Sequence, residues 1–403
     1  MPWQETDPVN ERVKFVAAAL RGDDTMTELC LMFGISRKTG YKILTRYKER
    51  GVEGLRDQSR APARHPNQTD PEVEGLILRV RRAHPTWGSK KILAVLERDQ
   101  GGDEWPARST IDEVLKRAGV VKPRRKRRRN QPSAPPLVEA TAPNDIWSID
   151  YKGWFLVGDG TRCDPLTIND VFSRASLVCR AMVAPKLGDV QSRLKLAFLE
   201  FGLPRFMLSD TGPPFGSSGL CRLSRLGVWL LRLGIQPVFI QPGHPEQNGR
   251  HERFHKTLKA ETASPPKATI PAQQAAFSWF RTTYNQERPH EALDMRTPAQ
   301  VYEPSLRSMP SRLAEHEYPS GYEVRRVRSE GTMKWAGEFV YVSEAMCGEL
   351  VGVAKVDEQH WHVYLGPMRL GVLHHASRTI VPLGWDFHRR VRSQSTDRAH
   401  RPK

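Results

Sequence analysis

The spacing of apolar residues in the first 120 positions is helical. Apolar side chains recur every three or four residues over 9–21 and 27–33, as they do along one face of an amphipathic helix. A glycine then allows a turn, and Ser36 is placed to cap a third helix that ends near residue 48. Helices joined by a short glycine-containing turn are typical of the helix-turn-helix motif. The pattern therefore predicts a helix-turn-helix domain over 1–60.

A second set of helical patterns follows a linker rich in Arg, Pro and Gly. Helices are expected near 70–82, 88–97 and 109–118. Their order again fits a helix-turn-helix, so we predict a second module over 68–121. Residues 122–143 carry a run of basic residues followed by Pro and Ala, which predicts a flexible basic linker.

The period of the pattern changes at residue 144. Apolar and polar residues now alternate in three segments, which predict three antiparallel strands over 147–156, 167–171 and 175–182. Helices and short apolar runs then take turns: a helix over 190–201, a strand at 206–209, a helix over 220–233 and a strand at 237–240. This order predicts an α/β core over 144–305 with a mixed five-stranded sheet.

Short β runs make up most of the remaining chain. Glycines and charged turns separate them, which predicts a small β-barrel over 318–385 as an accessory domain. The last segment, 386–403, is basic and is predicted to form a disordered tail. The chain is thus expected to be multidomain, with all-α modules, an α/β core and a C-terminal β domain.

The charge of the chain points to its partner. The net charge is +17 and the isoelectric point is about 9.9, and the basic residues are spread over several segments rather than confined to the linker. A distributed positive charge predicts a polyanion, here double-stranded DNA, as the partner.

The remaining composition argues for a protein of the cytoplasm. The five cysteines are scattered without a Cys-x-x-Cys pair, which indicates reduced thiols and no cysteine-based zinc site. The most apolar stretch, 228–240, is interrupted by Arg232 and Pro237, so no transmembrane helix is expected. The N-terminus has no hydrophobic signal region. We expect a soluble protein of the bacterial cytosol that associates with the nucleoid when bound to DNA.

Three acidic residues stand where a site could form. Asp150 lies in an alternating run, and Asp210 ends an apolar run just before a Gly/Pro turn, so both belong to strands. Glu252 is followed by Lys256 and Lys259 at i+4 and i+7, on one face of a predicted helix. Two aspartates and a glutamate can hold two hard cations such as Mg²⁺. The plainer interpretation of the helix is a solvated face with an ordinary Glu–Lys pair.

Three motifs in this order resemble the catalytic core of a known family. WSIDYKGWF, LSDTGPPF and GHPEQNGRHERFHKTLK are similar to the acidic motifs of insertion-sequence transposases of the retroviral-integrase type. The resemblance implies an RNase H-like fold and a DDE triad of Asp150, Asp210 and Glu252 holding two Mg²⁺ ions, with Mn²⁺ as a substitute. It also implies a polynucleotidyl transferase that cleaves the ends of an insertion sequence and joins them to target DNA, working as at least a dimer.

Two other acids compete for a place in this triad. Glu246 leaves 35 residues after Asp210, the spacing known for such cores, whereas Glu252 leaves 41. We choose Glu252, because the motif has its glutamate three residues after the glycine and basic residues four and seven positions further on. Six helical residues rotate by about 600°, so Glu246 would face about 120° away. Asp170 also ends a predicted strand, and we interpret it as a turn residue, because the family has no metal ligand there.

Candidate DNA contacts lie in three places. The start of the third helix carries five polar or basic side chains that a helix-turn-helix protein would use on bases and phosphates: Arg37, Lys38, Thr39, Tyr41 and Lys42. Arg124 and Arg125 in the linker are expected to follow phosphates, and the catalytic helix offers Arg250, Arg253, Lys256 and Lys259. The plain alternative for the first group is a three-helix bundle with a solvated basic face.

Other interpretations stay open beside the transposase. His251 and His255 are spaced like zinc ligands, but the rest of a metalloprotease motif is missing, so that interpretation receives little weight. A DNA-binding regulator or inactive relic would use only the helix-turn-helix modules. An RNase H-like nuclease would cut DNA without joining it.

Overall fold

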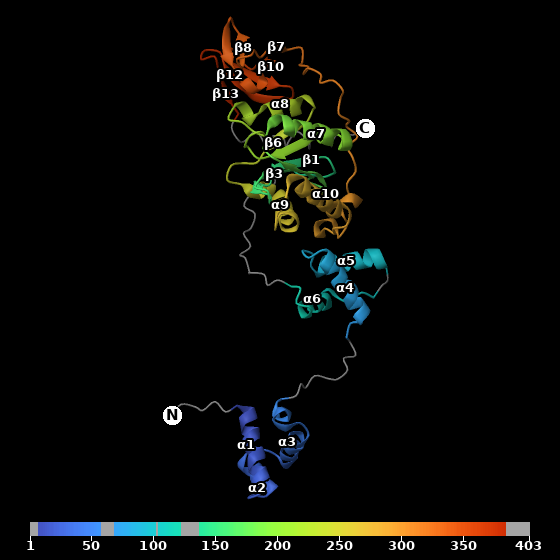
Figure 1. The fold of residues 1–403 in the computed structure, drawn as a ribbon. Coiled ribbons are helices and arrows are strands. Elements are labelled where there is room, and N and C mark those ends of the chain that lie inside the picture. Colours follow the sequence, from blue (N-terminus) through green and yellow to red (C-terminus); the bar gives the residue numbers. More distant parts are fainter. Residues whose placement is uncertain (1–6, 58–67, 102–103, 122–136, 384–403) are drawn as a thin grey trace, which may run out of the picture. The chain divides into compact units, whose positions relative to one another are not determined.

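The computed structural model describes residues 7–57, 68–101, 104–121 and 137–383. The chain divides into two compact units, Met1–Thr69 and Asp70–Lys403 (Figure 1). The linker residues Arg124 and Arg125 and the basic tail 386–403 lie outside the described residues.

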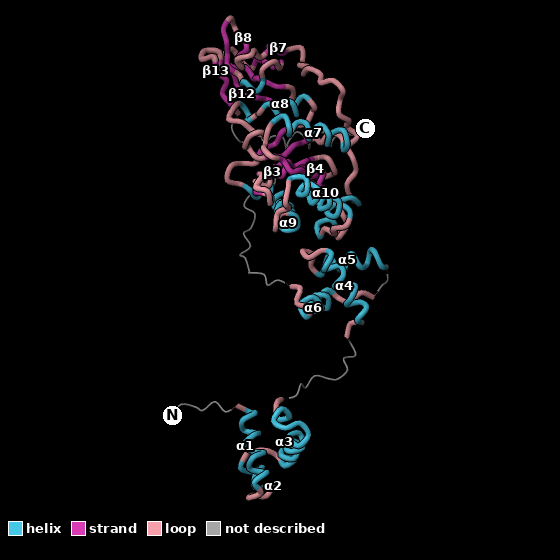
Figure 2. Tube along the Cα trace, viewed as in Figure 1, coloured by secondary structure: helices cyan, strands magenta, loops and turns pink. Residues whose placement is uncertain are grey.

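The first unit consists of helices, as the periodicity predicts (Figure 2). They are α1 (Pro8–Arg21), α2 (Met26–Met32), α3 (Arg37–Arg50) and the short 3₁₀ helix η1 (Gly51–Leu55). Ser36 is the N-cap of α3 and accepts a hydrogen bond from the backbone N–H of Thr39. Phe15, Leu29 and Leu55 form the centre of the core.

Three further helices begin the second unit. They are α4 (Pro71–Ala83), α5 (Ser89–Gln100) and α6 (Arg108–Arg117), close to the predicted ranges. Their core is built on Ile77, Trp87, Ile92 and Ile111, all fully buried. Each of the three helices contributes apolar side chains to this small core, so the helices pack on one another.

The central sheet has six strands rather than the five that the sequence predicts. They are β1 (Ile146–Tyr151), β2 (Phe155–Leu156), β3 (Arg162–Asp170), β4 (Ser176–Met182), β5 (Phe206–Ser209) and β6 (Gln236–Phe239). The extra strand arises because residues 152–154 leave the sheet, with Gly153 at φ 83°, a conformation that glycine adopts without steric cost. The predicted first strand is therefore split into β1 and β2.

The sheet is mixed, as the predicted order of strands and helices indicates. β3 pairs antiparallel with β1 on one side and with β4 on the other. β1 pairs parallel with β5, and β5 with β6. Parallel neighbours need crossover connections, and the helices α7 (Leu187–Phe201) and α8 (Arg225–Arg232) supply them.

The helices cover the sheet on both faces. Trp147 and Ile149 of β1 pack with α7 and α8 in one apolar core. On the opposite face, α9 (Gly249–Thr262) and α10 (Ile270–Gln286) pack through Phe254, Phe277 and Phe280 against the far end of the sheet. Because side chains alternate along a strand, Ser148 and Asp150 point to the face that α9 covers. Four short 3₁₀ helices complete the connections: η2 (Leu220–Arg222), η3 (Pro245–Asn248), η4 (Glu291–Leu293) and η5 (Pro298–Gln300).

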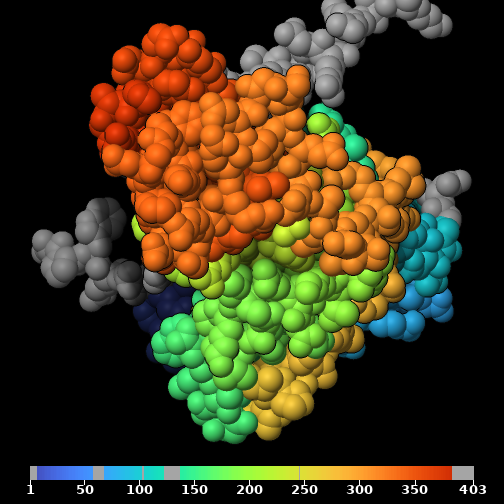
Figure 3. Space-filling view, turned by 90° about the horizontal axis from the view of Figure 1, so that it is seen from above, coloured from blue at the N-terminus to red at the C-terminus, as the bar shows by residue number. Residues whose placement is uncertain are grey.

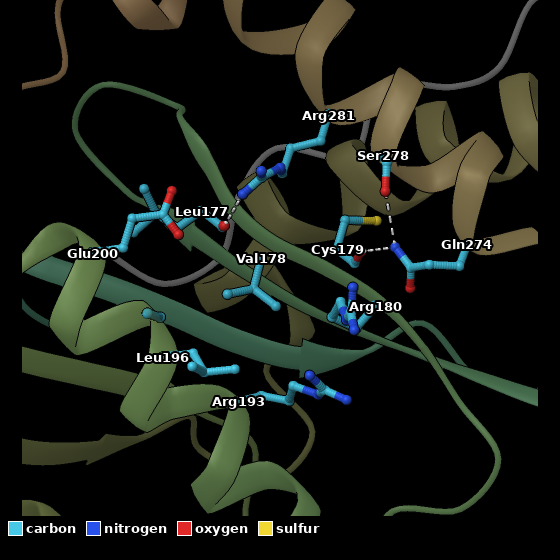
Figure 4. Close-up of a pocket in the computed structure, with 11 residues that line it drawn as sticks. Leu177, Val178, Cys179, Arg180, Arg193, Leu196, Glu200, Gln274, Ser278 and Arg281 are labelled. Atoms are coloured by element: carbon cyan, nitrogen blue, oxygen red, sulfur yellow. Dashed lines mark hydrogen bonds between the residues drawn. The ribbon is translucent and has the colours of Figure 1, made fainter. Parts of the chain in front are cut away.

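Side chains of α10 occupy the free edge of β4 (Figure 4). Gln274 donates to the carbonyl of Cys179 at 3.2 Å and accepts from the N–H of Ala181 at 2.9 Å. Asn285 likewise bonds both backbone groups of Ser176, at 2.8 and 2.9 Å. Such amides take the place of a neighbouring strand and block edge-to-edge pairing.

The C-terminal part is all β. An antiparallel sheet has the order β13-β12-β11-β10-β7, and β8 and β9 form a separate hairpin. Their bounds are β7 (Tyr322–Arg326), β8 (Thr332–Trp335), β9 (Glu338–Tyr341), β10 (Leu350–Lys355), β11 (His360–Leu365), β12 (Met368–His374) and β13 (Thr379–Pro382), with η6 (Glu344–Met346) between β9 and β10. The expected strands are present, and in the described part of the chain they form a five-stranded sheet and a two-stranded hairpin.

The two C-terminal sheets share one apolar core with the α/β core. Met333, Val351 and Leu373 cluster with Val228 and Leu231 of α8. Figure 3 shows these strands, in orange and red, lying against the green segment of the core. The second unit is therefore continuous from its sheet to its C-terminal strands.

Candidate catalytic site

Two of the predicted acids lie on neighbouring parallel strands. Asp150 is the fifth residue of β1, and Asp210 directly follows β5. The register between the strands pairs Ser148 with Leu208, and two residues further on it leads to Asp150 and Asp210. Both carboxylates therefore stand at the same end of the sheet, where open α/β sheets place their sites.

The third acid comes from the helix that covers this end. Glu252 lies in the first turn of α9 and is exposed. Burial, followed by the charges of Asp210 and Glu252, raises the pKa of Asp150 to about 7, while a backbone hydrogen bond and Lys152 oppose the change. Burial also raises the pKa of Asp210. The N–H of Gly212, which donates to its carboxylate at 3.2 Å, lowers this pKa but does not cancel the increase. Asp210 and Glu252 thus both act on the carboxylate of Asp150.

The donor set suits a hard divalent cation. The side chain of Asp150 is 22% exposed, so a ligand can reach it from solvent. Carboxylate oxygens are the preferred ligands of Mg²⁺, and the raised pKa of Asp150 shows that its negative charge is disfavoured in this environment. Within the described residues, however, no group of three or more His, Cys, Asp or Glu side chains is already arranged to enclose a metal ion.

The competing acids have other contacts. Asp170 is buried and accepts hydrogen bonds from the backbone N–H of Asn144 at 2.8 Å and from the N–H and hydroxyl of Ser173 at 2.7 and 2.6 Å. It therefore holds the turn between β3 and β4, as expected. Glu246 lies in η3 and its Oε1 is 2.8 Å from Nδ1 of His244. Of the two glutamates, Glu252 is the one whose charge raises the pKa of Asp150.

The structure shows a buried polar network beneath these acids that the sequence analysis does not predict. The hydroxyl of Thr167 on β3 donates to the backbone carbonyl of Asp150 at 3.1 Å. Its Oγ1 also lies 2.6 Å from Nε2 of His251 and 2.7 Å from Nε2 of His255. A hydroxyl has one proton and two lone pairs, so both imidazoles donate to Thr167. His251 then has an unprotonated Nδ1, which accepts from Ser148 Oγ at 2.7 Å.

Both histidines are held neutral. Burial lowers the pKa of His251 well below its usual range, and burial with the nearby Lys152 lowers the pKa of His255 to about 3. Neutral imidazoles match the hydrogen-bond assignment above. The i, i+4 spacing of His251 and His255 therefore serves the contact between α9 and the sheet, with Nδ1 of His255 3.9 Å from the carboxylate of Asp150.

The predicted basic residues of α9 all lie on its exposed side. Arg250, Arg253, Lys256 and Lys259 are exposed, and Arg250 donates to the carbonyl of Val171 at 3.2 Å. They flank Glu252 along the helix. Lys152, which the sequence analysis does not single out, follows β1 and lowers the pKa of Asp150. Its only sequence signal is its place two residues after Asp150, the candidate catalytic aspartate.

The predicted contacts of the first unit lie together at the start of α3. All five side chains are exposed: Arg37, Lys38, Thr39, Tyr41 and Lys42. The hydroxyl of Thr39 is 2.9 Å from that of Ser36 and so takes part in the helix cap. The other four side chains extend from the helix into solvent.

Comparison with known families defines the class of the protein. The integrase core domain matches residues 140–245 and 233–298. A helix-turn-helix domain matches residues 11–63, and a homeodomain-like domain matches residues 39–115. The chain is a DNA-binding protein that combines helix-turn-helix domains with an integrase core.

Similar proteins come from insertion elements. The insertion element IS476 uncharacterized 39.2 kDa protein of Xanthomonas euvesicatoria is 27% identical over 263 residues, covering 64% of this chain and 72% of that protein. The transposase for insertion sequence element IS904 of Lactococcus lactis is 29% identical over 168 residues, covering 40% of this chain and 62% of that transposase. The HTLV-2 integrase catalytic core domain, solved in complex with magnesium, has a TM-score of 0.33 and 17% identity, covering 41% of this chain and 100% of that domain. The chain thus carries an integrase core domain and is similar to proteins of insertion elements, one of which is named a transposase.

None of the helices that the structure describes has both the length and the apolar character that a membrane span requires.

Proposed function

We propose that this protein is a DNA transposase that cleaves the ends of an insertion sequence and transfers the new strand ends to target DNA. The observation that carries the proposal is the convergence on Asp150 of the charges of Asp210 and Glu252, from two strands and one helix of an integrase core domain. Water attacks the phosphodiester at the element end and releases a 3′-OH. That 3′-OH then attacks a phosphodiester of the target, whose own 3′ oxygen leaves.

The three carboxylates would hold the divalent cations of the reaction. Asp150 and Asp210 would hold one Mg²⁺, and Asp150 and Glu252 a second, with Mn²⁺ as a substitute. Bound there, two such ions activate the attacking oxygen and stabilise the leaving oxygen of an in-line displacement. The carboxylates fit this role because their oxygens are hard donors. Burial, followed by the charges of Asp210 and Glu252, raises the pKa of Asp150, and a bound cation would offset that negative charge.

The basic residues bind and orient the DNA. The exposed Lys256 and Lys259 would contact phosphates of the donor strand, assisted by Arg250 and Arg253. The start of α3 would read the terminal repeat in the major groove. The second helical module, α4–α6, would extend the recognised sequence, since linked modules gain effective concentration.

We also propose the setting in which the reaction occurs. Two element ends must be joined, so at least two protomers assemble on the DNA. The C-terminal strands would form a small barrel-like accessory domain for DNA contacts or assembly. A net charge of +17 suits a cytosolic protein associated with the nucleoid.

The test is an end-cleavage and joining assay with the full-length protein, linear DNA carrying the element ends, and Mg²⁺. We expect nicked ends and joined products from the wild type, and neither from Asp150→Asn or Asp210→Asn, while both variants still bind the ends. Cleavage by the wild type without any joined product would make the protein a nuclease. Binding of the ends without cleavage would make it a DNA-binding regulator.

A further inference from the structure

An exposed tryptophan stands beside the candidate catalytic site. Trp154 lies in the turn between β1 and β2, four residues after Asp150, and is 58% exposed. The positive φ of Gly153 allows the chain to turn sharply out of β1 immediately before it.

The indole is held in place although it is exposed. The guanidinium carbon of Arg162 lies 5.2 Å from the ring centroid of Trp154, within the range of a cation–π contact. Arg162 is itself fixed by two hydrogen bonds to Asp164, of 2.6 and 3.1 Å, and Asp164 is buried. A buried carboxylate therefore anchors the arginine, and the arginine covers one side of the ring. A planar partner meets a ring that is already oriented.

A cavity of about 130 Å³ adjoins this ring. Apolar groups from the sheet and from both neighbouring helices line it, together with Trp154: Phe155, Pro165, Leu258 and Phe277. Its two charged lining residues are Lys152 and Lys259. An aromatic wall, an apolar floor and two ammonium groups suit a flat heteroaromatic ring that carries phosphates.

The cavity lies between α9 and the segment that follows β1, two of the three places that carry the candidate acids. Lys152 follows Asp150 by two residues and acts electrostatically on it. Lys259 follows Glu252 by seven residues on the same side of α9, and both are exposed. DNA that reaches the three carboxylates therefore passes next to Trp154.

We propose that this cavity is a binding site for an unpaired nucleobase at the end of the DNA, stacked on Trp154, with the adjoining phosphates on Lys152 and Lys259. The proposal rests on the proposed function and identifies a substrate contact within it. An internal base of a duplex has neighbours on both faces, so only a base at the end or one released from the stack can lie against an indole. The positive charge around the ring favours a polyanion over an apolar segment of a second copy.

The test uses 2-aminopurine, whose fluorescence falls when it stacks on an aromatic ring. Full-length protein with Asp150→Asn, which keeps the DNA intact, is titrated with duplexes of the element end carrying 2-aminopurine at successive positions. We expect quenching at positions beside the cleavage point. Trp154→Ala should remove it and weaken binding of a frayed end by roughly 5- to 100-fold. Trp154→Phe should retain most of both.

Trp279 on α10 offers a matched control. It is 54% exposed, almost as much as Trp154, and lies outside the cavity. Trp279→Ala should leave the quenching unchanged. The inference is overturned if Trp154→Ala keeps the quenching or if Trp279→Ala lowers it equally. It is also overturned if light scattering shows that Trp154→Ala changes the molar mass of the protein and this change alone accounts for the lost quenching. Because cleavage by the wild type is scored separately, quenching without cleavage would contradict the proposed function alone.

Discussion

The two faces of strand β1 differ in their contacts, one being apolar and the other hydrogen-bonded. On one face Trp147 and Ile149 are fully buried in an apolar core with α7 and α8. On the other, Ser148 bonds His251 of α9 directly, and the backbone carbonyl of Asp150 is linked to the histidines of α9 through Thr167. Apolar packing gives stability but tolerates small shifts. Hydrogen bonds fix direction, and losing one partner leaves a buried group unsatisfied. The fold thus places its stability on one face and the geometry of its site on the other.

The largest expected effect belongs to the apolar face. Trp147→Ala should lower the free energy of unfolding by about 3–5 kcal/mol, because it leaves a large cavity in the core. It also removes the indole N–H that donates to Asn144 at 3.0 Å. Chemical denaturation of the full chain measures the change. A loss below about 1 kcal/mol would mean that this face does not carry the stability.

The polar face is tested by Thr167→Val, which keeps the shape and removes the hydroxyl. Two imidazole donors and one carbonyl lose their partner, so we expect a loss of about 1–3 kcal/mol. Turnover should fall with little change in DNA affinity, because α9 and Glu252 are no longer fixed against β1. Thr167→Ser is the matched control and should restore both. Equal loss of turnover in the serine variant would remove the hydroxyl from the explanation.

The pH dependence of stability distinguishes the faces further. The pKa of Asp150 is raised from 3.8 to about 7 in the folded protein, so the folded state holds this proton more tightly than the unfolded chain. The resulting stabilisation is complete below pH 3.8 and is lost as the pH rises through 7. In metal-free buffer, Asp150→Asn should therefore be more stable than the wild type by up to about 4 kcal/mol at pH 8, since each pKa unit corresponds to about 1.4 kcal/mol. The difference should vanish near pH 4. A constant difference across this range would exclude titration of Asp150 as its cause.

The smallest effect on stability is expected from the outer side of α9. Lys256→Ala should change the free energy of unfolding by less than about 0.5 kcal/mol, because the side chain is exposed. Its effect should appear in DNA affinity, with the salt dependence reduced by about one unit of slope. Fluorescence anisotropy at several salt concentrations measures both. An unchanged slope would mean that Lys256 does not contact a phosphate.

Local signals predict much of the fold. The cap at Ser36, the helices of both N-terminal modules and the order of strands in the core follow from periodicity and capping chemistry, which act over a few residues. The sixth strand is missed because a single glycine, Gly153, interrupts an otherwise continuous alternation. The C-terminal strands are predicted, but whether they close depends on pairing between strands far apart in the chain, which alternation does not encode.

The candidate site is predicted less completely, because it too depends on contacts between residues that are far apart in the chain. Asp150, Asp210 and Glu252 stand in motifs that can be found by eye. The partners of His251 do not stand in such motifs, because Ser148 and Thr167 are common residues more than 80 positions away. Only the packing of α9 on β1 and β3 brings them together. The exposure of Trp154 and its contact with Arg162 likewise depend on the path of a turn.

The central claim is that Asp150, Asp210 and Glu252 form one cation site, and direct Mn²⁺ binding to the metal-free full-length protein tests it. Electron paramagnetic resonance reports the free Mn²⁺ during a titration. We expect Asp150→Asn and Glu252→Gln to weaken binding by at least the roughly 10- to 100-fold that loss of an outer-shell partner costs, and Glu246→Gln to bind like the wild type. Wild-type affinity in Glu252→Gln together with weakened binding in Glu246→Gln would contradict this account.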